Sequence, residues 1–197
     1  MKRCSIVIHS VSGNVFIIGS YLTECLKNRG VDARLYRVED TDLHILANTL
    51  DSVNQYYEDI LELPVCHHET LTKSDMVILG SPTRFGNMTA EMKAFLDTTY
   101  EMSEERALQG TLFGCFTSCP HTLSEGAHAL DSLVYWAQIQ AMIHIPFGIH
   151  MDIASSYDQP AAGIVHLEGK ENLIRPSAQL ADTIEAYADT VAGYLEE

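Results

Sequence analysis

Positively charged residues are scarce in this sequence of 197 residues. It contains 12 lysines and arginines against 27 aspartates and glutamates, which gives a formal net charge of −15 at pH 7. The longest basic run is Lys2-Arg3. Because nucleic-acid binding depends on lysines and arginines that neutralise phosphates, we expect no nucleic-acid partner. We interpret the excess of acidic residues as an acidic surface that keeps the protein soluble.

Long apolar runs and ordered cysteine pairs are missing as well. No apolar run approaches the roughly 20 residues that cross a bilayer, and the first run, Ser5–Ile8, is too short for the core of a signal peptide. We therefore expect no membrane insertion. The cysteines are odd in number and scattered, which favours free thiols and a reducing, cytoplasmic location; they are Cys4, Cys25, Cys66, Cys115 and Cys119.

The short motifs that mark dinucleotide, ATP and metal sites are also absent. Neither Gly-x-Gly-x-x-Gly nor Gly-x-x-x-x-Gly-Lys-[Ser/Thr] occurs in the chain. Cys66-His67-His68-Glu69 holds metal-binding residue types, but adjacent residues on one element seldom face one ion, and no second ligand pair follows at zinc-like spacing. Cys115 and Cys119 lack the Cys-x-x-Cys spacing of redox pairs. The sequence therefore predicts no metal site and no dithiol centre.

Apolar segments of strand length alternate along the chain with segments of helical spacing. Length and composition predict a single domain, residues 1–197. The alternation is typical of an α/β fold with a doubly wound parallel sheet and helices on both faces, and we predict five strands in the order 2-1-3-4-5. The predicted strands are 4–9, 33–38, 76–79, 111–117 and 143–147, and the predicted helices are 16–29, 41–63, 88–100, 124–140 and a last helix from residue 176. Residues 148–174 are predicted to form a long loop.

Residues 10–15 follow the first predicted strand and lead into a helix. The first-turn amides of a helix have no partner within it, and the helix dipole favours an anion there. Hydroxyl, amide and glycine residues at this point predict a phosphate-binding loop with neutral donors: Ser10, Val11, Ser12, Gly13, Asn14 and Val15. Such turns often serve only as helix caps, and this loop alone leaves that alternative open.

Two further loops leave the carboxyl ends of predicted strands. The second carries a hydroxyl, a guanidinium, an aromatic ring and a glycine, groups that suit a flat heteroaromatic ligand; its residues are Pro82, Thr83, Arg84, Phe85 and Gly86. The third is Ser118, Cys119, Pro120, His121 and Thr122. In the predicted strand order the three loops converge at the switch point of the sheet, where open α/β proteins bind ligands. Arg84 is the only cation expected in this site, and a salt bridge at the surface or between subunits is its alternative role.

The second loop has a specific resemblance to a known family. Gly80-Ser-Pro-Thr-Arg-Phe-Gly-Asn-Met88, followed by Glu91-Met-Lys-Ala-Phe-Leu-Asp97, resembles the flavin-contacting loop of the WrbA family. Weaker similarity includes the first strand and loop and Arg175-Pro-Ser177. The resemblance implies a flavodoxin-like fold, an FMN cofactor and two-electron transfer from NAD(P)H to a quinone-like acceptor. It also implies a homodimer or homotetramer in which a neighbouring subunit completes each site.

The chain departs from the family at several positions. Family members have a loop rich in glycine and threonine where this chain has Cys119, Pro120 and His121. They have a tyrosine where this chain has Ser12. Gln140 aligns with a histidine that lies beside the flavin, and Ser103 with a tryptophan that walls the substrate side, so the resemblance implies a cofactor contact at Gln140 and a substrate contact at Ser103. Because flavins carry out the electron transfer themselves, no side chain is assigned as catalytic. Two other functions stay open: an electron-carrying flavodoxin without small-molecule turnover, and a flavin-free regulatory relative.

Overall fold

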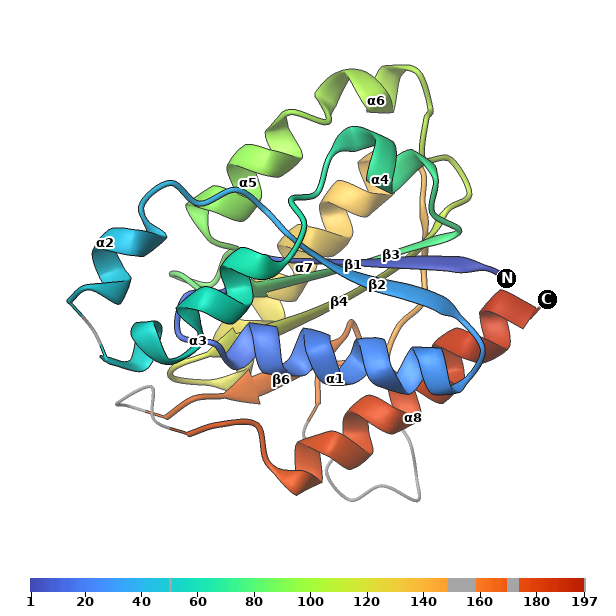
Figure 1. Ribbon diagram of the computed structural model, residues 1–197. Coiled ribbons are helices and arrows are strands. Elements are labelled where there is room, and N and C mark those ends of the chain that lie inside the picture. The colour runs from blue at the N-terminus through green and yellow to red at the C-terminus, as the bar shows by residue number, and fades with distance from the viewer. Residues whose placement is uncertain (50, 149–158, 170–173, 197) are drawn as a thin grey trace.

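A parallel β-sheet runs through the centre of the protein. The computed structural model describes residues 1–49, 51–148, 159–169 and 174–196. Within them the strands are hydrogen-bonded in the order β2-β1-β3-β4-β5, which confirms the predicted order, and β6 also pairs with β4 (Figure 1). The strands are β1 (Arg3–Ile8), β2 (Asp32–Arg37), β3 (Met76–Pro82), β4 (Leu112–Cys119), β5 (Ile143–His144) and β6 (Ile164–Leu167).

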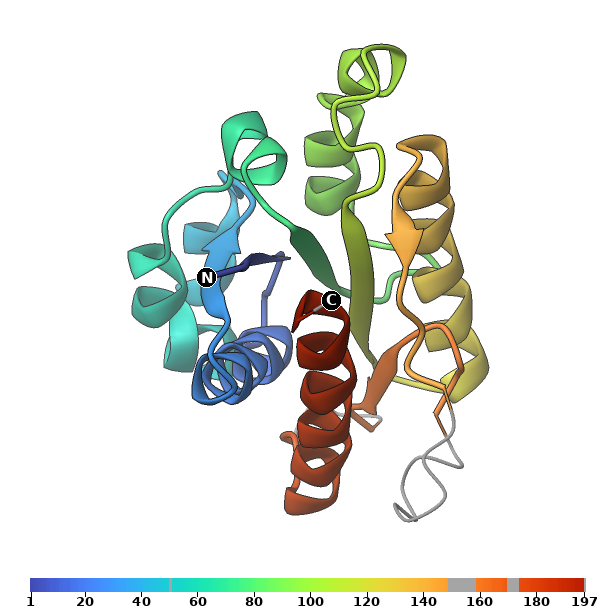
Figure 2. The same ribbon diagram turned by 90° about the vertical axis from the view of Figure 1, so that its right-hand side faces the viewer.

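Helices cover both faces of this sheet (Figures 1 and 2). On one face, α1 and α8 enclose an apolar cluster with the sheet, and on the other face α4, α5, α6 and α7 enclose a second cluster. The helices are α1 (Asn14–Asn28), α2 (Leu43–Ala47), α3 (Asp51–Glu62), α4 (His68–Thr72), α5 (Ala90–Asp97), α6 (Tyr100–Glu104), α7 (Leu123–Ile139) and α8 (Ala178–Glu196). Among the described residues, none of these helices combines the length and apolar character needed to cross a membrane.

Strand β1 shows how the sequence builds the two layers. Successive side chains of a strand point to opposite faces of a sheet. Cys4, Ile6 and Ile8 lie in the cluster under α1 and α8, whereas Val7 lies in the cluster under α5 and α7. A strand that is covered on both faces is apolar at nearly every position, as the sequence predicts for this segment. The same alternation directs the next residue, His9, toward the layer of α5.

The predicted helix over residues 41–63 is wrong in one respect, because the structure has two helices there. Helix α2 ends at Ala47, and the hydroxyl of Thr49 donates to the carbonyls of Ile45 and Leu46 at 3.1 Å. Threonine competes in this way with the backbone amides that would continue a helix. The apolar spacing of the sequence runs on across the break because both helices pack in one cluster, which also contains Val11 of the first loop.

The fifth strand also differs from the prediction of 143–147. Strand β5 pairs only Ile143 and His144 with the start of β4, and β6 pairs with the second half of β4, from Phe116 to Cys119. Two short strands therefore share the edge that one continuous strand was expected to occupy. Strand β6 lies inside the predicted loop 148–174, of which residues 149–158 and 170–173 lie outside the described residues.

The five cysteines are free thiols in buried positions. Burial raises the pKa of the Cys66 thiol to about 12, and burial also raises the pKa of the Cys25 and Cys119 thiols. Because the thiolate is the reactive form, these cysteines behave as apolar core residues. The predicted redox inactivity of the cysteines agrees with this environment.

Substitutions at two glycines can test the packing between β4 and α8. A Cβ atom added to Gly114 would come within 2.2 Å of the hydroxyl oxygen of Tyr187, which is fully buried and donates to the carbonyl of Ile145 at 3.0 Å. An added Cβ at Gly193 in α8 has no neighbouring atom within 4 Å. We predict that Gly114→Ala lowers the free energy of unfolding by about 1–3 kcal/mol. Gly193→Ala should raise it by about 0.5–1 kcal/mol, because alanine favours the helix.

Urea unfolding followed by circular dichroism measures both changes. The two variants carry the same chemical substitution, so opposite signs would show that the close approach of Gly114 to Tyr187 decides the result. An unchanged unfolding midpoint for Gly114→Ala would contradict this packing.

Candidate functional site

The structure brings the three predicted loops to one edge of the sheet. The amide of His9 donates to the carbonyl of Gly80 at 3.0 Å, and the amide of Thr83 donates to the carbonyl of Ser118 at 2.8 Å. The segments that follow β1, β3 and β4 therefore leave the sheet side by side. Strands β3 and β4 are longer than predicted, and Pro82 pairs with Ser118 within them.

The first loop ends in a free helix terminus. Gly13 has a φ of +94° and is the N-cap of α1, a conformation that favours glycine. The hydroxyl of Ser10 accepts the amide of Phe16 at 3.1 Å. The amides of Gly13, Asn14 and Val15 have no hydrogen-bond partner within the described part of the chain. A helix end with unpaired amides and a positive dipole is suited to an anion.

Arg175 adds a full positive charge to this loop. Its guanidinium donates to the carbonyl of Ser12, to Oδ1 of Asn14 at 2.9 Å and to Oε1 of Gln55 at 3.0 Å. The expectations that the loop has only neutral donors and that Arg84 is the only cation of the site are therefore wrong. Arg175 is separated from the loop by most of the chain, so only the fold places it there.

Tyr56 of α3 closes the side of the same loop. A Cβ atom added to Gly13 would lie 2.2 Å from Cδ2 of Tyr56, so the ring packs directly on the glycine backbone. The guanidinium of Arg175 lies 4.9 Å from the centre of the Tyr56 ring, a cation–π distance. Glycine, free amides and a guanidinium in one half-buried loop fit a phosphate group. Tyr56 and Arg175 both contact this loop, and neither was predicted as a site residue.

The second loop is a tight turn with a fully exposed aromatic ring. Arg84 and Asn87 exchange two backbone hydrogen bonds of 2.8 and 3.0 Å. Between them Phe85 has a φ of 51° and Gly86 a φ of 69°, the arrangement of a type I′ turn. A positive φ costs a phenylalanine about 1–2 kcal/mol, and the ring is not buried against the chain to offset that cost. Such strain is typical of functional loops.

Arg84 lies on the same turn with its side chain in solvent. Its Nη1 atom donates to the carbonyl of Thr83 at 3.0 Å. Within the described residues of this chain it forms no ion pair. The predicted alternative of a salt bridge therefore has no partner in the described part of one chain, and the guanidinium is available to a ligand.

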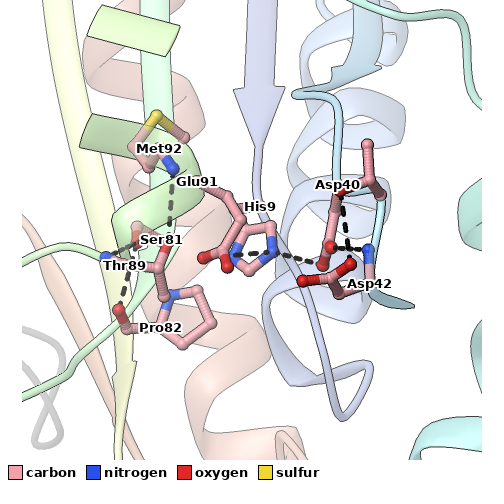
Figure 3. Close-up of polar contacts among 9 residues, drawn as sticks. His9, Asp40, Asp42, Ser81, Pro82, Thr89, Glu91 and Met92 are labelled. Atoms are coloured by element: carbon pink, nitrogen blue, oxygen red, sulfur yellow. Dashed lines mark hydrogen bonds and ion pairs between the residues drawn. The ribbon is translucent and has the colours of Figure 1, made fainter. Parts of the chain in front are cut away.

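A buried hydroxyl network supports the second loop from below. The hydroxyl of Thr117 donates to the carbonyl of Ser81 at 2.6 Å and contacts the hydroxyl of Thr83 at 2.8 Å. The hydroxyl of Ser81 accepts the amide of Thr89 at 3.0 Å (Figure 3). These bonds tie the start of the loop to β4 and to the N-terminus of α5.

The third loop combines strand residues with a helix cap. Ser118 and Cys119 are buried in β4, and Thr122 caps α7 by accepting the amide of Glu125 at 3.1 Å. Pro120 and His121 lie between Cys119 and Thr122 and are more exposed than the strand residues. The hydroxyl of Ser118 donates to Oε1 of Glu168 at 2.6 Å, and both side chains are buried. Glu168 follows β6 and was missed because its segment was predicted as loop.

Gln140 and Ser103 do not join the three loops. Gln140 follows α7, a helix of 17 residues that begins at the third loop. At about 1.5 Å of rise per residue, α7 carries Gln140 roughly 25 Å away. Its Nε2 donates to the carbonyl and hydroxyl of Thr99 at 3.0 and 3.1 Å. Ser103 lies in α6, and its hydroxyl donates to the carbonyl of Tyr100 at 2.6 Å. Within one chain Gln140 therefore contacts Thr99 and lies away from the three loops, and its expected cofactor contact stays a prediction.

The chain is similar in sequence to known proteins. Residues 8–153 match the family described as NADPH-dependent FMN reductase. A protein named NAD(P)H dehydrogenase (quinone) from Archaeoglobus fulgidus is 30% identical over 162 residues, which cover 80% of this chain and 83% of the relative. The NAD(P)H quinone oxidoreductase PST1 of Candida albicans is 29% identical over 150 residues, which cover 74% and 71%.

Solved structures share the fold over the whole chain. The flavodoxin, WrbA-like protein from Agrobacterium tumefaciens superposes with a TM-score of 0.68 at 19% identity, covering 100% of this chain and 98% of the other. A flavodoxin from the domain Archaea gives 0.64 at 15% identity, covering 99% of each chain. At these identities the two structures support the fold alone.

Proposed function

The chain belongs to the NADPH-dependent FMN reductase family, and from this membership we infer that it is an FMN-dependent oxidoreductase that transfers two electrons from NAD(P)H to a quinone-like acceptor. The names of its relatives support this substrate pair. The structural observation that carries the proposal is the first loop, where free amides of α1 and the guanidinium of Arg175 meet. The membership also supports the resemblance to the WrbA family seen in the second loop.

The described residues form one such phosphate cradle at this edge, which favours a mononucleotide. The amides of residues 13–15 and the guanidinium of Arg175 would hold the phosphate of FMN, and charge-assisted hydrogen bonds of this kind are the stronger ones. The ring system would lie between residues 82–86 and residues 118–122. Bound FMN supplies the electron transfer.

The exposed side of the proposed site, next to Phe85 and Arg84, supports a ping-pong mechanism. Phe85 and Arg84 border the predicted ring position, and the exposed guanidinium of Arg84 would attract the anionic nicotinamide nucleotide. We propose that the donor and the acceptor use this one face in turn. The protein then binds, orients and shields the reactants, and no side chain has to move a proton during hydride transfer.

The first prediction concerns the cofactor. Purified protein should quench the fluorescence of added FMN and bind FMN more tightly than FAD. Arg175→Ala should weaken FMN binding by about tenfold to a hundredfold, because a charged hydrogen bond contributes about 1.5–3 kcal/mol. Arg175→Lys keeps the charge and should lose less. Arg34→Ala removes an exposed arginine of β2 that pairs with Asp32 and is the matched control.

Tighter binding of FAD than of FMN would contradict the phosphate assignment. An equal loss of affinity in Arg175→Ala and Arg34→Ala would show that Arg175 acts only through the net charge of the protein.

The second prediction concerns turnover. In anaerobic stopped-flow mixing, NADH or NADPH should bleach the bound flavin, and a later addition of a soluble quinone should restore its colour. Arg84→Ala should slow the bleaching more than Lys93→Ala, a control that removes an exposed cation of α5 paired with Asp97. If neither nucleotide bleaches the flavin, an electron carrier or a regulatory protein becomes the better explanation.

We further propose that residues 1–197 form one domain. This domain would assemble as a homodimer or homotetramer, and the protein would be located in the cytoplasm. The fully exposed, strained ring of Phe85 supports a subunit contact at the rim of the site, because exposed apolar groups at such places mark interaction sites, and closed symmetry is the default for such assemblies. Free, buried cysteines support a reducing compartment, which cell fractionation would check.

Light scattering tests the assembly. We expect a mass of two or four times 21.9 kDa, and Phe85→Asn should shift it toward the single chain. Ile45→Asn, at an exposed apolar residue of α2, should leave the mass unchanged. A mass of 21.9 kDa for the unmodified protein at micromolar concentration would contradict the assembly.

A further inference from the structure

We propose that His9, Asp40 and Glu91 form a binding site for a divalent transition-metal cation, separate from the proposed flavin site. Their ligand atoms all lie within 4.8 Å of one another. His9 Nε2 is 3.0 Å from Asp40 Oδ2 and 3.8 Å from Glu91 Oε2, and Figure 3 shows both carboxylates pointing at the imidazole.

The spacing of these atoms is close to that of ligands around one ion. Zinc binds histidine nitrogen and carboxylate oxygen at about 2.0–2.2 Å, which places neighbouring ligand atoms about 3.0–3.6 Å apart. The distance from His9 to Asp40 already lies in this range. Glu91 is more exposed, with 37% of its side chain accessible, so a rotamer change brings its oxygen the remaining distance. One imidazole nitrogen and two carboxylate oxygens suit Zn²⁺ or Mn²⁺.

The three residues lie in the segments that follow three neighbouring strands. His9 follows β1, Asp40 follows β2 and Glu91 lies in the first turn of α5, the helix after β3. The amide of Val38 donates to the carbonyl of Ile8 at 2.8 Å, so the ends of β1 and β2 stay in register. The second oxygen of Asp40 accepts the amide of Asp42 at 2.9 Å. Such support orients a ligand toward its ion.

Within the described residues, the side chain of His9 makes its polar contacts only with this cluster. Its side chain is 3% exposed, and its Nδ1 atom has no hydrogen-bond partner in the described part of the chain. Among the described residues, the carboxylates of Asp40 and Glu91 are the side-chain partners of its Nε2 atom. Two negative groups therefore face one nitrogen that can carry one proton. A cation between them removes their mutual repulsion.

A pocket of about 740 Å³ gives an ion access to the cluster. Asp40 and Glu91 line it, together with the carboxylates of Glu39, Asp42 and Glu69 and the imidazoles of His67 and His68. Among the described residues that line it there is no lysine or arginine. Such a pocket concentrates cations by its electric field. Water in it can fill the coordination positions that the protein leaves open.

This proposal differs from the expectation of no metal site. That expectation rested on Cys66-His67-His68-Glu69, and in the structure this segment supplies pocket walls, with His68 Nε2 bonded to the hydroxyl of Thr98 at 2.8 Å. The cluster itself is formed by residues far apart in the sequence. No short motif could reveal it.

The test uses the full chain after treatment with EDTA and dialysis. Titration with MnCl₂, followed by the electron paramagnetic resonance signal of free Mn²⁺, should show one ion bound per chain. ZnCl₂ should raise the thermal unfolding midpoint, because a ligand that binds only the folded state stabilises it. Glu91→Gln and Asp40→Asn should each weaken Mn²⁺ binding by at least about tenfold.

The controls are Glu69→Gln and His67→Gln, which change the same pocket outside the cluster and should alter the affinity less than about threefold. Circular dichroism establishes that each variant is folded, and the exposed position of Glu91 keeps the test valid if Asp40→Asn does not fold. The proposal fails if millimolar Mn²⁺ does not bind, or if Glu69→Gln weakens binding as much as Glu91→Gln. Neither readout depends on flavin, so both results are independent of the proposed function.

Discussion

The hydrogen-bonded register of β1, β3 and β4 decides where the functional groups of this protein lie. The amide of His9 is bonded to Gly80 and the amide of Thr83 to Ser118, so three chain segments leave the sheet at one level. Buried hydroxyls of Thr117 and Ser81 hold the same segments from below. A ligand that touches all three loops therefore meets a backbone that is ordered before binding, which reduces the entropic cost of binding.

The parts of the site that could be predicted from the sequence are those set by local chemistry. Apolar runs and helical spacing located most of the strands and helices, and their alternation along the chain predicted the strand order. Gly13 predicted a close backbone turn before α1, and its φ of +94° agrees with that prediction. Residues 82–86 were predicted as a loop after the third strand, and the turn found there is formed by four consecutive residues. In each case the residues that form the feature are neighbours in the chain.

The parts that could not be predicted depend on residues far apart in the sequence. Arg175, just before α8, is hydrogen-bonded to Asn14 of the first loop, and Glu168 reaches Ser118 because β6 completes the edge that β5 leaves open. The place of Gln140 within one chain likewise depends on the fold. Alignment with a family gives the residue at a position, but the length of α7 decides how far that residue lies from the loops.

The end of β1 separates the two proposed sites, which differ in charge. Ser10 turns toward α1 and the proposed phosphate loop, whereas His9 turns toward α5 and the cluster with Glu91. Neighbouring residues can serve an anion and a cation because side chains alternate across a strand. At an effective dielectric constant of about 20, opposite unit charges about 10 Å apart attract by roughly 1.7 kcal/mol. A phosphate bound on one side and a cation bound on the other would therefore favour each other without sharing a ligand, and in a chain with a net charge of −15 the cation would also relieve the repulsion among the carboxylates around it.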